Sequence, residues 1–122
     1  MLSEMLVNKD SGDSPYLSVV IPCFNARKTI SETLDAICSQ DANFPFEIIV
    51  IDSSNDGTDN IIRTRYPRIQ LIHLDRQTLP GSGRNLGVNH ARGEIVVFTD
   101  SDCVPDPDWL SRIAHVYQNK KT

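Results

Sequence analysis

Four short, mostly apolar runs recur along the chain, separated by longer polar stretches. Runs of this length that stay apolar on successive residues are typical of strands buried on both faces of a sheet. The pattern therefore predicts four buried β-strands, at Leu17–Ile21, Phe46–Ile51, Ile69–Leu74 and Ile95–Thr99.

The stretches that follow these runs have helical rather than strand-like spacing. In the first of them, Ile30, Leu34 and Ile37 fall on one helical face. We predict helices over Lys28–Ser39, Thr58–Tyr66, Ser82–Ala91 and Asp108–Gln118. Strands that alternate with helices in this way predict an α/β fold of three layers, α/β/α, around a mostly parallel sheet.

Length and composition fit one globular domain. The chain has 122 residues, of which 39% are hydrophobic and 23% charged. Its net charge of −4 argues against a nucleic-acid partner, which would need a basic face to neutralise phosphates. No apolar run approaches the roughly 18 residues that span a bilayer. We expect residues 1–16 to be a flexible leader and residues 17–122 to form the domain.

The cysteines bear on the compartment. Cys23, Cys38 and Cys103 are odd in number and share no CxxC spacing, so neither a disulfide framework nor a structural zinc site is expected. A reducing compartment follows. The expected location is the cytoplasm, or the inner face of the membrane in the setting of a longer chain.

Unusual polar residues cluster where the predicted strands end. Ligands of open α/β sheets bind beyond the carboxyl ends of the strands, so these residues are the candidates for function. They are Pro22, Phe24 and Asn25 after the first strand, Asp52 after the second, Arg84 after the third, and Asp100, Ser101 and Asp102 after the fourth.

Asp100 and Asp102 form a DxD turn, which can aim two carboxylates into one space. Hard divalent cations such as Mn²⁺ or Mg²⁺ prefer such oxygen ligands and complete their shell with water and phosphate. The structural alternative is that both acids only cap the turn and the helix that follows.

Two other residues have a functional and a structural interpretation. Asp52 has oxygens that can accept hydrogen bonds from a base N–H or a sugar hydroxyl, or it simply ends the strand in an Asx-turn. Arg84 can fork onto phosphate or base oxygens, with Gly81 and Gly83 allowing close backbone approach, or it can form an ion pair with Asp100 or Asp102. The histidines share no metal-ligand spacing and are expected on the surface.

The motifs together resemble the inverting family 2 glycosyltransferases. The resemblance covers Leu17 to about Trp109 and rests on fragments in a fixed order. They are Val19-Val-Ile-Pro-x-Phe-Asn25, Ile49-Val-Ile-Asp52 with Asp56-Gly-Thr58, Gly83-Arg-Asn-x-Gly87, Ala91-Arg-Gly-Glu94 and Asp100-Ser-Asp102.

This resemblance implies a GT-A fold with strand order 3-2-1-4, of which the chain would be the truncated, nucleotide-binding front half. The donor would be a UDP- or GDP-linked sugar, and an unidentified acceptor hydroxyl would receive the sugar with inversion. The catalytic base is expected beyond the end of this chain. By resemblance, Asp102 binds Mn²⁺ or Mg²⁺, and the nucleotide-sugar contacts come from Pro22, Phe24, Asn25, Asp52, Arg84, Asp100 and Ser101. Core packing is the alternative for Phe24.

Two further functions compete with this interpretation. A haloacid-dehalogenase-like phosphatase carries DxDx[TV] after a strand, and Phe98–Val104 fits that string. A non-catalytic module that only binds nucleotide is the other.

An open sheet edge at the fourth strand would also favour self-association with another copy of the chain.

Overall fold

The computed structural model describes residues 2–77 and 79–121 of the chain. Within them, four parallel strands form one sheet in the order β3-β2-β1-β4, as the resemblance implied. The strands are β1 Leu17–Cys23, β2 Phe46–Asp52, β3 Gln70–His73 and β4 Ile95–Phe98. The helices are α1 Ile30–Cys38, α2 Thr58–Arg65, α3 Pro80–His90 and α4 Trp109–Lys121.

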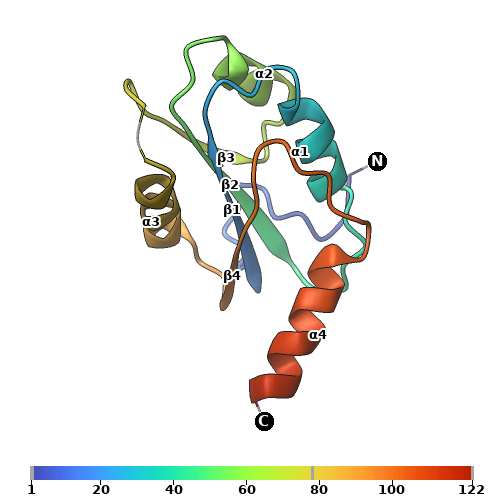
Figure 1. Cartoon of the computed structure of the whole chain (residues 1–122). Coiled ribbons are helices and arrows are strands. Elements are labelled where there is room, and N and C mark those ends of the chain that lie inside the picture. Colours follow the sequence, from blue (N-terminus) through green and yellow to red (C-terminus); the bar gives the residue numbers. More distant parts are fainter. Residues whose placement is uncertain (1, 78, 122) are drawn as a thin grey trace.

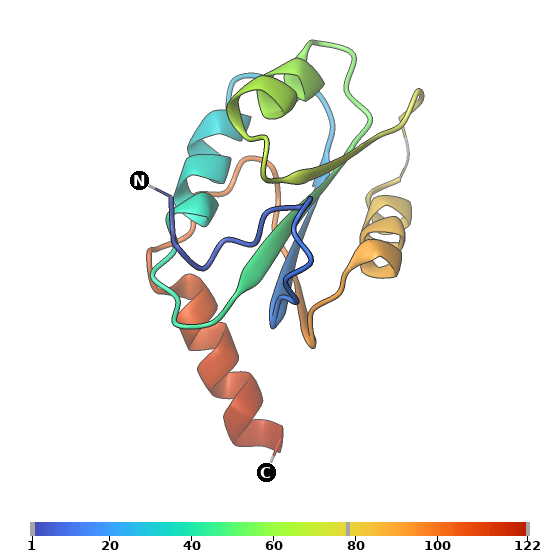
Figure 2. The same ribbon diagram turned by 180° about the vertical axis from the view of Figure 1, so that it is seen from behind.

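The sheet is covered on both faces, which confirms the predicted three layers (Figures 1 and 2). Successive side chains of a strand point to opposite faces. Val19 and Ile21 of β1 therefore face the larger core beneath α1, α2 and α4, whereas Val20 faces α3. All three are fully buried, which explains why β1 has no polar alternation in its sequence.

Helix α3 lies directly on the sheet because two of its residues have no side chain. A Cβ added to Gly87 would lie 2.2 Å from Val20 Cγ1, and one added to Gly83 would lie 3.4 Å from Pro22 Cβ. Gly81 has open space around it. The close approach that the sequence indicated is therefore, at Gly83 and Gly87, an approach of helix to sheet.

Strand β1 continues through Pro22 to Cys23, whereas the sequence suggested that Pro22 ends it. The Val20 carbonyl accepts a hydrogen bond from Thr99 N–H on the β4 side, and the Cys23 carbonyl accepts one from Ser53 N–H on the β2 side. The backbone groups of successive residues in β1 point alternately to the β4 side and to the β2 side. The Pro22 nitrogen therefore faces the β4 side, where pairing has already stopped at Phe98. No ladder hydrogen bond is lost, so proline is tolerated inside the strand.

The segment before β1 differs from the flexible leader expected from its polar composition. Leu6 and Val7 are buried, and Val7 N–H donates to the Phe46 carbonyl while Phe46 N–H donates to that of Met5. The two apolar residues cover the start of β2, which a polar segment could not do. In the described residues, no helix combines the length and apolar character that a bilayer crossing requires.

Candidate functional site

A cavity of about 170 Å³ opens at the carboxyl edge of the sheet. The ends of β1 and β2, the loop after β3 and the turn after β4 contribute its walls. Its lining residues are Pro22, Cys23, Phe24, Ile51, Ser53, Gln77, Asp100 and Ser101. Other surface hollows are larger, but they lie away from this edge, where the topology of a parallel sheet places ligand sites.

Four of the residues singled out from the sequence meet in this cavity: Pro22, Phe24, Asp100 and Ser101. Phe24 is 42% exposed, so the core-packing alternative for its side chain is wrong. The other four lie outside the cavity lining: Asn25, Asp52, Arg84 and Asp102.

Asn25 joins the loop after β1 to the loop after β2. Its backbone N–H donates to Ser54 Oγ at 2.7 Å, and its side-chain oxygen accepts from Asn55 N–H at 2.9 Å. The residue has φ +49°, a left-handed conformation that asparagine tolerates better than most residues. The contacts of Asn25 therefore brace the cavity wall.

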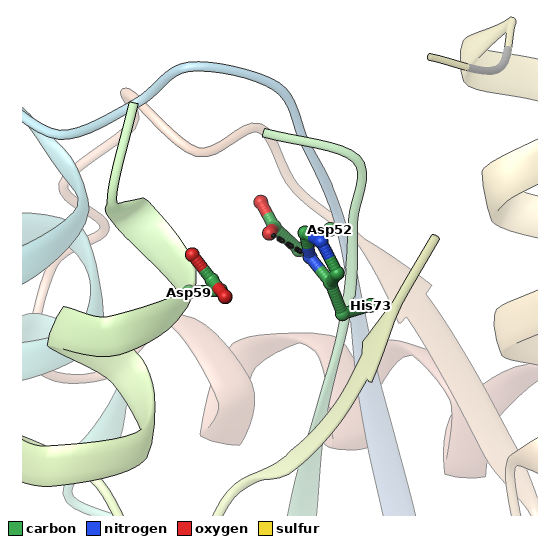
Figure 3. Close-up of side chains that lie close together, drawn as sticks. All are labelled: Asp52, Asp59 and His73. Carbon is green, nitrogen blue, oxygen red and sulfur yellow. Dashed lines mark hydrogen bonds and ion pairs between the residues drawn. The ribbon is translucent and has the colours of Figure 1, made fainter. Parts of the chain in front are cut away.

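Asp52 is fully buried at the end of β2. The Ser54 hydroxyl donates to its Oδ1, and His73 Nδ1 lies 2.8 Å from its Oδ2. An ionised carboxylate only accepts hydrogen bonds, so the imidazole is the donor when Asp52 is charged. Figure 3 shows this pair, with Asp59 of α2 facing it.

Cys23 lies in the same region, paired in register with Asp52. Burial, followed by the negative charge of Asp52, raises the pKa of the Cys23 thiol to about 12. The group therefore stays a neutral thiol at physiological pH. It fills the floor of the cavity and is not available as a thiolate nucleophile.

The acidic turn, residues 100–102, is held by the first turn of helix α1 and its N-cap residue Thr29. Thr29 Oγ1 and Thr33 Oγ1 each donate to the Ser101 carbonyl at 3.0 Å. Two hydroxyls on one carbonyl fix the backbone of the turn, while the Asp100 and Asp102 side chains stay exposed. With Cys103, they offer ligand atoms that all lie within 4.8 Å of one another.

Arg84 is exposed on α3. In the described part of the chain it forms no ion pair with Asp100 or Asp102, so the structural salt bridge considered for it is not formed. The guanidinium remains available to an anion.

Three features of the site were missed in the sequence: His73, the Thr29–Thr33 pair, and Gln77. His73 was expected on the surface, yet it is the register partner of Asp52 across β2 and β3. Aligning the ends of the two predicted strands would have revealed this pairing. The role of the two threonines could not be predicted from the sequence, because their partner is a backbone carbonyl 68 or more positions away.

A parallel 3-2-1-4 sheet with an acidic turn at its switch point is the architecture of GT-A glycosyltransferases, and the similar solved structures are of this class. The chain belongs to glycosyl transferase family 2, whose family model matches residues 18–122. The phosphatase alternative is therefore wrong.

Among curated relatives, the chain is 36% identical over 105 residues to glycosyltransferase AglE of Haloferax volcanii, covering 80% of this chain and 34% of the relative. The chain thus spans about a third of that relative's length.

Two solved structures are similar. Residues 1–349 of Staphylococcus aureus TarS in complex with UDP align with TM-score 0.75 and 32% identity, covering 84% of this chain and 32% of the other. The mannosyltransferase PcManGT of Pyrobaculum calidifontis, in complex with GDP-Man and Mn²⁺, aligns with TM-score 0.71 and 33% identity, covering 88% and 34%.

Proposed function

We propose that this chain binds a nucleotide-diphosphate sugar, UDP- or GDP-linked, together with a divalent cation. It would contribute this binding to inverting transfer of the sugar to an acceptor hydroxyl. One observation carries the proposal: Pro22, Phe24, Asp100 and Ser101 line a single cavity at the carboxyl edge of the sheet. The similar TarS and PcManGT structures, in complex with UDP and with GDP-Man and Mn²⁺, support it.

The proposed roles follow from the position of each group. Phe24, which is 42% exposed beside the cavity, offers an aromatic face for a base. Asp52 is fully buried and outside the cavity lining, but each carboxylate oxygen has more than one lone pair, so it accepts a hydrogen bond from the nucleotide once its side chain becomes accessible. Asn25 braces the wall, and exposed Arg84 provides positive charge for phosphate oxygens.

The acidic turn fits a hard divalent cation. Asp100 and Asp102 are exposed carboxylates whose oxygens lie within the spacing of a common ligand set, and oxygen donors suit Mn²⁺ and Mg²⁺. We assign Asp102 as the metal ligand and place Asp100 and Ser101 against the nucleotide. A bound cation would stabilise the charge that develops on the departing nucleoside diphosphate.

A non-catalytic nucleotide-binding module remains the second candidate. The roles proposed above are all binding roles, and none of these residues is proposed to deprotonate the acceptor hydroxyl. We therefore expect donor binding by this chain but negligible turnover of the donor sugar.

Calorimetric titration tests the proposal with UDP and GDP, each with and without Mn²⁺. We expect Mn²⁺ to raise the affinity for one of these nucleotides about tenfold, within the usual range of coupling between two ligands. Asp102→Asn should abolish this gain. Asp106→Asn removes another exposed carboxylate nearby and should keep it. Failure of both nucleotides to bind, with or without Mn²⁺, would reject the proposed function.

A further inference from the structure

A second group of metal-ligating side chains lies beside the cavity. Asp52 ends β2, Asp59 is in the first turn of α2, and His73 ends β3. Each offers one ligand atom, and the three atoms lie within 4.8 Å of one another. Figure 3 shows the Asp59 carboxylate turned toward the Asp52–His73 pair.

The fold brings these residues together without depending on a long loop. Asp52 and His73 are register partners on neighbouring parallel strands. Helix α2 begins at Thr58, only six residues after β2 ends, so its first turn returns above the same strand ends. Two strand termini and one helix therefore define the group, which is the kind of rigid support that a metal site requires.

The donor set differs from that of the acidic turn. One imidazole and two carboxylates make three protein ligands, the number that binds Zn²⁺ when a fourth position is left for water or another ligand. Imidazole favours Zn²⁺ and similar transition metals over Mg²⁺ and Mn²⁺. We propose that Asp52, Asp59 and His73 form a second cation site that binds Zn²⁺.

The present contacts of these residues are compatible with such a site. Ser54 donates to Oδ1 of Asp52 and can hold the carboxylate in place while Oδ2 exchanges the imidazole for the metal. Arg63, whose side chain is 50% exposed, pairs with Asp59 Oδ2 and can orient that carboxylate from outside. The His73 side chain is 25% exposed and that of Asp59 20%, which leaves a path from solvent.

Occupation of this site has a consequence that rests on the proposed function. Asp52 cannot ligate Zn²⁺ with Oδ2 and still offer the same acceptor geometry to a nucleotide. Zn²⁺ at this site is therefore a competitor of the nucleotide, whereas Mn²⁺ at the acidic turn assists its binding. The two cations act in opposite directions from positions on the same sheet edge.

Zinc titration by calorimetry tests the site itself. All proteins carry Asp102→Asn and Cys103→Ser, which remove two of the three metal-ligating groups of the acidic turn. In this background we expect one Zn²⁺ per chain. His73→Gln keeps a hydrogen-bond donor for Asp52 but removes the imidazole, and Asp59→Asn removes one carboxylate. Each should weaken Zn²⁺ binding by more than the roughly tenfold loss typical of removing an outer partner of a metal site.

His90→Gln is the matched control, since His90 is exposed on α3 and is outside the group. It should bind Zn²⁺ as the background protein does. Equal Zn²⁺ affinity in the background protein and in His73→Gln would overturn the site, as would absence of Zn²⁺ binding in the background protein. Far-ultraviolet circular dichroism confirms that the variants are folded.

A second titration separates this inference from the proposed function. UDP and GDP are titrated into protein with the natural acidic turn, with Mn²⁺ present, before and after one equivalent of Zn²⁺. Zn²⁺ should weaken nucleotide binding in the unchanged protein but not in Asp59→Asn. Zn²⁺ binding without any nucleotide binding would reject the proposed function and leave the site standing. Nucleotide binding that Zn²⁺ does not weaken would refute the competition.

Discussion

At the scale of single residues, the hydroxyls of Thr29 and Thr33 are the main support of the acidic turn. Replacing both by valine keeps their shape but leaves the Ser101 carbonyl without either donor. We expect Mn²⁺ affinity to fall on the order of tenfold, as for loss of an outer partner, and unfolding free energy to fall by about 1–2 kcal/mol.

Thr64→Val is the control for this prediction. Thr64 Oγ1 donates to the Asn60 carbonyl on the exposed side of α2, away from the turn. It should leave Mn²⁺ affinity, followed by electron paramagnetic resonance of free Mn²⁺, as in the unchanged protein. If the double valine variant binds Mn²⁺ normally, the threonines do not position the turn.

Asp56 gives the chain a pH-dependent contribution to stability. Slight desolvation opposes the effect, but hydrogen bonds from Thr58 and Arg27 hold the pKa of Asp56 below its usual value of 3.8. Its folded form thus releases the proton more readily than its unfolded form. The contribution is present above pH 3.8 and is lost as pH falls through the lowered pKa.

The measurement is the unfolding free energy from urea titrations between pH 2 and 7, for the unchanged protein and for Asp56→Asn. The stability difference between the two proteins should be constant near neutral pH and should shrink below about pH 4, near the usual pKa of a carboxyl. A difference that stays unchanged down to pH 2 would show that these hydrogen bonds do not favour the ionised carboxylate.

At the scale of elements, α3 depends on its glycines for its distance from the sheet. A side chain at Gly87 would collide with Val20 in the middle of β1. Gly87→Ala should therefore destabilise the protein by about 1–3 kcal/mol, as overpacking does. Gly81→Ala meets no atom within 4 Å and should be neutral or slightly stabilising. Thermal unfolding of both variants measures the two changes in stability. Equal changes in the two variants would contradict the packing account.

The elements themselves were largely predictable from the sequence. All eight were expected in the right order, because β1 and β2 are mostly apolar and α1 has clear helical spacing. The end of β1 was missed, since tolerance of Pro22 depends on where β4 stops. Buried Glu47 was not expected either, because its partners Ser18 and Arg92 come from distant segments. The same holds for the candidate site. The residues that follow the strand ends were predicted from the sequence, whereas the contacts that join different strands and loops were not.

At the scale of the whole molecule, β4 is an edge strand of the sheet, and no strand of the described residues pairs with its outer side. Phe98 on this strand is 44% exposed, and an exposed apolar edge strand favours pairing with another chain. We expect association that rises with concentration in sedimentation velocity. Phe98→Lys should suppress it, whereas Val116→Lys, at an apolar residue of α4 that is also exposed, should not. A monomer at all concentrations would contradict this expectation.

The central claim is that a nucleotide and a divalent cation meet at the acidic turn. Paramagnetic broadening by Mn²⁺ in the presence of UDP or GDP, read from the amide resonances of the isotope-labelled chain, tests it most directly. Amides of residues 23–25 and 100–103 should lose intensity, and those in the second half of α4 should keep theirs. Broadening centred on any other part of the chain, or none at all, would contradict the account.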